Sequence, residues 1–162
     1  MIRNGNGRRE RSILLAALLV TSIVTTAGMT FADQVVNNID TTIDPELEEV
    51  TTTVNTPVTI GFYIKAVTGG GDAPGCNATG TNPATLTIMP PSGVSVTPTT
   101  LTFTGCGDNN TQYASFTASS AGTYTFNEGN FSMSGGKAGS IWNLDTARFT
   151  LIVNPQQILL RQ

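Results

Sequence analysis

Apolar and polar residues alternate in short runs that are separated by turn-forming glycine and proline. The clearest run has apolar residues at every second position, at Val58, Ile60, Phe62, Ile64 and Ala66. A period of two with one apolar face predicts a β-strand that is buried on one side. Shorter runs of the same kind occur at 50–54, 84–88, 94–96, 100–104, 114–118, 123–126 and 147–153. Short strands at near-regular intervals predict an all-β sandwich or barrel.

The first 32 residues have the features of a secretory leader. Four arginines lie among the first 11 residues, an apolar run covers residues 13–24, and small residues lead up to Ala32. A basic start, a short apolar centre and small residues before a break indicate a signal peptide, so we predict one over residues 1–32, cleaved after Ala32. The alternative is a retained membrane anchor formed by the same N-terminal hydrophobic helix, because residues 13–32 are about long enough to span a bilayer.

Removal of this leader leaves an acidic chain. The remainder has 4 lysines and arginines against 10 aspartates and glutamates, a net charge of −6. So few cations cannot neutralise a phosphate backbone, and we therefore expect no nucleic-acid partner. Anionic membrane surfaces are disfavoured for the same reason. Contact with a membrane is expected only through the N-terminal segment, if it stays uncleaved.

The rest of the chain divides into three parts. Residues 33–46 are predicted to be an acidic polar leader segment, because their scattered apolar residues follow neither a helical nor a clear strand period. Residues 47–154 contain the alternating runs and are predicted to form a single β-sandwich domain of about seven to eight strands. Residues 155–162 are a short C-terminal tail.

Cys76 and Cys106 are the only cysteines of the chain. Two cysteines in an exported protein are expected to pair, so we predict one disulfide between them. Both lie in loop-like stretches, which places the bond between two loops at one end of the sandwich. The chain has no histidine and no Cys-x-x-Cys motif, so we predict no metal and no cofactor. For residues 108–110 (Asp-Asn-Asn) a calcium site is weighed against an ordinary polar turn, which we prefer.

Two motifs give the predicted sandwich a family resemblance. Residues 121–124 (Ala-Gly-Thr-Tyr) look like a tyrosine corner, in which the phenol of Tyr124 bonds back to nearby backbone. Residues 92–98 (Ser-Gly-Val-Ser-Val-Thr-Pro), followed by Leu-Thr-Phe at 101–103, are similar to a segment recurrent in prokaryotic surface modules. Residues 47–154 thus resemble an immunoglobulin-like antiparallel β-sandwich of bacterial or archaeal secreted and cell-surface proteins. The resemblance implies no catalytic residues, and the cysteines depart from the inter-sheet positions of antibody domains.

Groups for enzymatic chemistry are sparse. Without histidine, and with both cysteines oxidised, Ser-His-Asp and Cys-His mechanisms are excluded. Two carboxylates could still act as in a glycosidase, and the acidic residues of the predicted loops are Asp72, Asp108, Glu128 and Asp145. Lone loop acids are usually solvated, so we predict that the protein is not an enzyme.

Two further classes of side chain are candidates for modification or binding. Asn-x-Ser/Thr sequons make Asn77, Asn109 and Asn130 candidates for N-glycosylation. Tyr63, Tyr113 and Trp142 are the aromatic side chains that could stack on a sugar. A single tryptophan in a small sandwich is usually packed in the core, and we prefer that interpretation for Trp142.

The leader, the β pattern, the predicted disulfide and the sparse catalytic groups together favour an exported, non-enzymatic module. We expect it to be secreted or on the extracellular face of the cell envelope, with a structural or adhesive role and with other surface proteins or a second copy as partners. One alternative is a self-assembling pilus- or thread-like filament subunit, in which residues 33–43 add as a strand to a neighbour's sheet. A second alternative is a carbohydrate- or ligand-binding sandwich.

Overall fold

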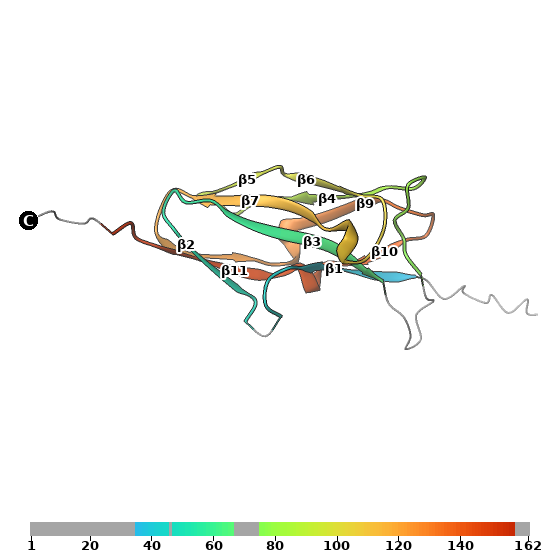
Figure 1. Cartoon of the computed structure of the whole chain (residues 1–162), viewed down its shortest axis with the longest axis horizontal. Helices are drawn as coiled ribbons and strands as arrows, with labels where there is room; N and C mark the ends of the chain where they lie inside the picture. The colour runs from blue at the N-terminus through green and yellow to red at the C-terminus, as the bar shows by residue number, and fades with distance from the viewer. Residues whose placement is uncertain (1–34, 46, 67–74, 158–162) are drawn as a thin grey trace, which may run out of the picture. The chain divides into compact units, whose positions relative to one another are not determined.

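The computed structural model describes residues 35–45, 47–66 and 75–157 (Figure 1). The chain divides into two units, Met1–Thr30 and Phe31–Gln162, and the predicted signal peptide or anchor lies outside the described residues. The described residues form β-strands and short 3-10 helices, with no α-helix among them, so the predicted all-β class is confirmed. In these ranges no helix has the length and apolar content needed to cross a membrane.

Eleven strands are described, more than the predicted seven to eight. They are β1 (Val36–Thr41), β2 (Glu49–Thr53), β3 (Val58–Ala66), β4 (Ala84–Ile88), β5 (Val94–Thr97), β6 (Thr100–Phe103), β7 (Gln112–Ala118), β8 (Gly122–Phe126), β9 (Phe131–Gly135), β10 (Ile141–Asn143) and β11 (Phe149–Asn154). The 3-10 helices are η1 (Asp108–Asn110), η2 (Glu128–Asn130) and η3 (Asp145–Ala147). Each alternating run of the sequence overlaps one of these strands, with ends that agree to within two residues.

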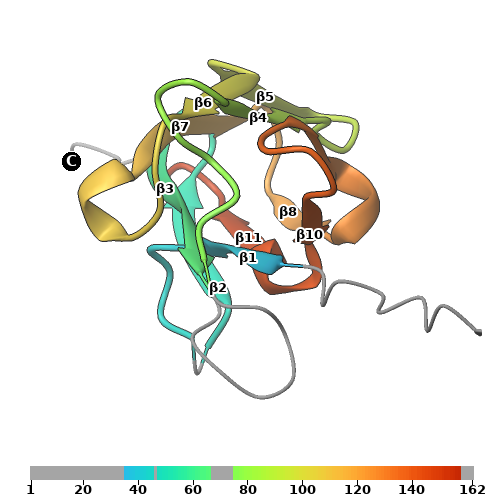
Figure 2. The same cartoon turned by 90° about the vertical axis from the view of Figure 1, so that its right-hand side faces the viewer.

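The strands form three hydrogen-bonded sheets. A five-stranded sheet has the order β10-β1-β3-β7-β5, and two three-stranded sheets have the orders β2-β11-β8 and β6-β4-β9. Only Asn127 and η2 separate β8 from β9, so this one chain segment pairs first with β11 and then with β4. Seen nearly along the strands, the sheets surround a common interior (Figure 2).

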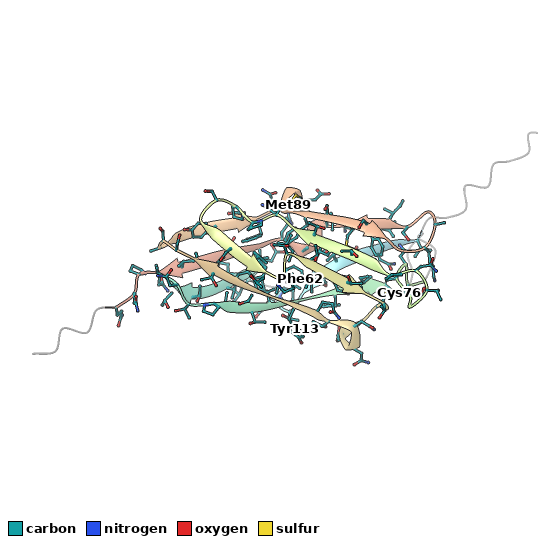
Figure 3. The ribbon with its side chains drawn as sticks, turned by 90° about the horizontal axis from the view of Figure 1, so that it is seen from above. Phe62, Cys76, Met89 and Tyr113 are labelled. Carbon is teal, nitrogen blue, oxygen red and sulfur yellow. A yellow bond between two sulfur atoms is a disulfide. The ribbon has the colours of Figure 1, made fainter. Side chains whose placement is uncertain are left out.

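Phenylalanine rings fill this interior and connect the three sheets. Phe116 of β7 meets Phe126 of β8 and Phe149 of β11 edge-on, with ring centroids 5.3 and 5.4 Å apart. Phe131 of β9 contacts Phe62 of β3 and Phe126, at 6.0 and 6.2 Å. Phe62 is fully buried and lies inside the ribbon in Figure 3. Of the inward residues predicted from the alternation in β3, Ile60 and Ile64 are buried like Phe62, while Val58 and Ala66 at the two ends of the strand are partly buried.

The folded unit begins earlier than residue 47, which corrects the predicted domain boundary. Residues 36–41, predicted as part of an acidic polar leader, form β1, which pairs antiparallel with β3 and parallel with β10. The inward positions of β1 are Asn37, Ile39 and Thr41, and all three are buried. Because two of the three are polar, the buried face of this strand has no apolar period. The prediction also lacks β10, because three residues are too few to show a period.

Candidate functional site

A disulfide joins Cys76 to Cys106, as predicted, with 5.8 Å between their Cα atoms. Cys76 lies in the loop that leads to β4, and Cys106 lies in the loop between β6 and η1. Figure 3 shows Cys76 at one end of the strands. The predicted link between two loops at one end of the fold is therefore confirmed.

Two buried asparagines connect β1 to the disulfide-linked loop. Asn37 is 0% exposed; its Nδ2 donates to the Gly75 carbonyl at 2.9 Å, and its Oδ1 accepts the N–H of Asn77 at 2.8 Å. Asn77 is 3% exposed, and its Nδ2 donates to the carbonyls of Val35 at 2.7 Å and Ile141 at 3.2 Å. Buried polar groups need such partners, so this pair fixes how β1, the loop and β10 meet. The sequence does not reveal this pair, because asparagine is also a common residue of exposed turns.

The three sequons differ in the environment of their amide groups. The buried Asn77 amide is occupied by its two hydrogen bonds, so a glycan on Asn77 does not fit this fold, which corrects the prediction for that residue. Asn130 donates from Nδ2 to the Met89 carbonyl at 2.8 Å and accepts the N–H of Asn127 at 3.0 Å. Asn109 is exposed on η1. Glycosylation at Asn109 fits the structure best and stays a prediction.

The predicted loop acids are distributed over separate turns. Asp108, Glu128 and Asp145 each begin a different 3-10 helix, and Asp72 lies outside the described residues. The Asp145 carboxylate pairs with the Arg148 guanidinium at 3.2 Å. Within the described ranges, no group of three or more His, Cys, Asp or Glu side chains could hold a metal ion. The segment 108–110, weighed above as a calcium site, forms the turn η1.

The aromatic candidates lie on opposite faces of the five-stranded sheet. Trp142 is the register partner of the buried Asn37 and packs, partly buried, against the hydrophobic core. Tyr63 and Tyr113 occupy outward positions of β3 and β7, next to the buried Phe62 and Ala114. Tyr113 is 58% exposed and lies at the margin of the ribbon in Figure 3. The two tyrosines therefore share an outer surface, from which Trp142 is absent.

Tyr113 lies over Gly61 on this outer surface. The two residues are register partners, and a Cβ atom on Gly61 would come within 2.9 Å of Tyr113 Cε1. The same atom would come within 2.7 Å of the methyl groups of Thr42 and Thr111. Glycine inside a strand marks such close approaches, and this is the signal by which the sequence could have identified the site. These four residues, together with Tyr63, form the outer-face patch.

Carboxylates border the outer-face patch and affect Tyr63. Asp40 is the register partner of Tyr63, and its Oδ2 lies 3.7 Å from the Nζ of Lys65. Burial raises the pKa of Tyr63 above its ordinary value of 10.0, and the charges of Asp40 and Asp108 and a hydrogen bond to Asp40 raise it further. The Tyr63 hydroxyl therefore stays protonated at neutral pH and donates its hydrogen to Asp40.

This raised pKa predicts a pH-dependent contribution of Tyr63 to stability. A tyrosine that holds its proton more tightly in the folded state contributes stability that is fully present below its unfolded pKa and falls as the pH rises through its folded pKa. We expect the difference in unfolding free energy between the wild type and Tyr63→Phe to be constant below about pH 9 and to fall above about pH 10. Urea unfolding of both proteins at a series of pH values measures it, and a difference that does not change with pH would refute the assignment.

Tyr124 makes a hydrogen bond to the backbone of the turn that precedes its strand. Its hydroxyl donates to the Ser120 carbonyl, four residues earlier in the chain, at 3.0 Å. Ser120 lies in the turn between β7 and β8, and Tyr124 lies in β8. The phenol therefore ties the start of β8 to the turn that precedes it.

No family model matches the chain, and no curated protein matches it either. The features of the molecule that bear on its function are therefore the fold, the disulfide and the outer-face patch.

Proposed function

We propose that the described unit is an immunoglobulin-like β-sandwich. Such a sandwich has strands A, B, E and D in one sheet, in the order A-B-E-D, and strands C, F and G in the other. The order β1-β3-β7-β5 corresponds to A-B-E-D. β4 then takes position C, the segment β8–β9 position F and β11 position G, and all seven letters follow the order of the chain. The extra strands β2 and β6 extend the second sheet at its edges, next to β11 and β4.

Tyr124 supports this assignment independently of the strand order. The tyrosine corner of immunoglobulin-like domains lies near the start of strand F, and its hydroxyl bonds back to the backbone a few residues earlier. Tyr124 is in β8, the first half of the proposed strand F, and bonds to the Ser120 carbonyl. Both the place of the residue and its hydrogen bond agree with the corner.

The proposed function is that of an exported, non-enzymatic module with a structural or adhesive role at the cell surface. The Cys76–Cys106 disulfide carries this proposal, because disulfides persist in oxidising compartments and are rare in the cytosol. The predicted signal peptide over residues 1–32 supports export. The fold alone does not specify an activity, so the role is assigned from the compartment and from the exposed surface.

Fractionation of the producing cells tests this proposal. We expect the protein in the medium or envelope fraction, sensitive to protease added to intact cells, and lighter than the reduced form by the two hydrogens lost in the disulfide. A cytoplasmic protein of the same cells, probed in parallel, controls for lysis. Protein that is cytoplasmic, protease-resistant in intact cells and carries free thiols would refute export.

The filament alternative requires a strand that can pair with a neighbouring molecule, and in this fold β1 is already paired within its own sheet. Strand addition by residues 33–43 requires β1 to leave its own sheet, where β3 and β10 pair with both of its edges. The buried Asn37 and its hydrogen bonds would be lost at the same time. We therefore place this alternative behind the surface module.

A further inference from the structure

We propose that the outer-face patch binds an uncharged carbohydrate chain, with the ring of Tyr113 as its stacking surface. The inference deepens the adhesive role proposed above, because it names the class of ligand that the module would hold. The patch combines an exposed ring on the outer face of the sheet, hydrogen-bonding groups around that ring and a negative local charge.

The backbone of Gly61 lies beneath the ring of Tyr113 and supports it. Gly61 is buried although it points to the outer face, and the Cε1 atom of Tyr113 lies 2.9 Å from the place where a Cβ of Gly61 would be. The ring therefore lies over the glycine at its Cε1 atom, while the residue as a whole stays 58% exposed. An exposed aromatic ring is the group that packs against the apolar C–H face of a pyranose.

Groups that can bind hydroxyls lie beside this ring. Tyr63 donates its hydroxyl hydrogen to Asp40, and its phenol oxygen can accept a hydrogen bond from a sugar hydroxyl. Thr42 accepts the N–H of Gly61 through its Oγ1 at 2.9 Å, which leaves its own hydroxyl hydrogen for another partner. The Asp40 carboxylate, whose Oδ2 is 3.7 Å from Lys65, has further lone pairs to accept sugar hydroxyls. A binding site needs a few such polar groups next to an apolar surface.

The local charge selects among carbohydrates. Asp40 and Asp108 both act electrostatically on Tyr63, while the ammonium of Lys65 is paired with Asp40. Two carboxylates against one paired cation leave the border of the patch negative, which repels uronate, sulfate and phosphate groups. The ligand is therefore an uncharged glycan. Because the patch lies on an open face of the sheet, it can contact several sugars of a chain but cannot enclose a single sugar.

A purely structural role for Tyr113 is the competing explanation. An aromatic residue opposite a strand glycine stabilises the sheet by covering the exposed backbone. That role requires the ring but no ligand. It also predicts that replacement of Tyr113 changes stability alone, so binding measurements separate the two explanations.

The experiment titrates the purified full chain with four soluble hexasaccharides and follows backbone amides by NMR. Three are uncharged, built of β-1,4-glucose, β-1,4-N-acetylglucosamine and α-1,6-mannose, and the fourth contains alternating uronate. At up to about 10 mM sugar, we expect saturable shifts of the Gly61 and Tyr113 amides with at least one uncharged chain and none with the uronate chain. No saturable shift of these amides with any uncharged chain, or tighter binding of the uronate chain, would overturn the proposal.

Variants assign the binding to the ring. Tyr113→Ala is expected to weaken binding by about tenfold or more, and Tyr113→Phe to stay within about twofold of the wild type. Tyr113→Thr provides a second variant with a strand-favouring residue, should the alanine variant fold poorly. Thr125→Ala, an exposed change on β8, is the matched control and should bind as the wild type. Wild-type affinity in a folded Tyr113→Ala or Tyr113→Thr protein would refute the role of the ring. These assays use purified protein, so their failure leaves the proposed export and surface location untouched.

Discussion

Replacing Cys76 and Cys106 together by serine is expected to lower the free energy of unfolding by about 3–4 kcal/mol. The bond closes a loop with a sequence separation of 30 residues. A cross-link of this length stabilises mainly by removing conformations from the unfolded chain. The closed loop contains β4 and β6 of the second proposed sheet and β5 of the first, so strands of both sheets are constrained before they fold. Urea unfolding followed by circular dichroism measures the loss.

Two controls separate the cross-link from the substitution itself. The wild type in the presence of a reducing agent should unfold at nearly the same urea concentration as the double serine variant, because both lack the bond. Thr125→Ala, exposed on β8, should stay within about 0.5 kcal/mol of the wild type. If the oxidised and reduced proteins had equal stability, the bond would not constrain the unfolded chain as argued.

We expect the loss of the disulfide to weaken the hydrogen bonds of the buried pair Asn37 and Asn77 before those of other parts of the fold. The Cys106 Sγ lies 3.5 Å from the Oδ1 of Asn37, and Asn77 directly follows Cys76. Since Asn37 and Asn77 hold β1 against the disulfide-linked loop, loosening this loop also loosens the first strand of the fold. In hydrogen exchange, we therefore expect the amide of Asn77, whose acceptor is Asn37, to lose protection more than the amides of β11.

The sequence predicts best what depends on local pattern. The alternation at residues 58–66 predicts both the bounds and the buried face of β3, because a half-buried strand needs one apolar side. Pairing of Cys76 with Cys106 is predicted from their number and from the expected compartment. Neither inference requires knowledge of the neighbouring strands.

What the sequence could not predict depends on partners far along the chain. β1 is missed because Asn37 and Thr41, which face the interior, are polar and are stabilised there by hydrogen bonds and packing unseen in the sequence. The sequon at Asn77 is read as a surface signal, although the fold buries its amide between β1 and β10. The outer-face patch joins Gly61 to Tyr113, and only the register of β3 with β7 brings them together. Sheet order and register are non-local, so a single sequence leaves them open.

Replacing Phe116 by alanine is expected to cost about 3–5 kcal/mol of unfolding free energy. Phe116 is fully buried on β7 and contacts Phe62 of its own sheet. Across the interior it meets Phe126 and Phe149 edge-on, and those two rings stack on each other at 4.5 Å. Removing the ring leaves a cavity between two sheets, which can close only if strands on both sides move. Equilibrium urea unfolding measures the change.

The neighbouring residue supplies the matched control for this prediction. Thr117 lies on the same strand but on the outer face, so Thr117→Ala should change the unfolding free energy by no more than about 0.5 kcal/mol. A loss for Phe116→Ala below about 1 kcal/mol would mean that the sheets do not share one interior. The contrast between adjacent positions tests the two-residue period, because inward and outward residues of one strand then differ in energy as the alternation requires.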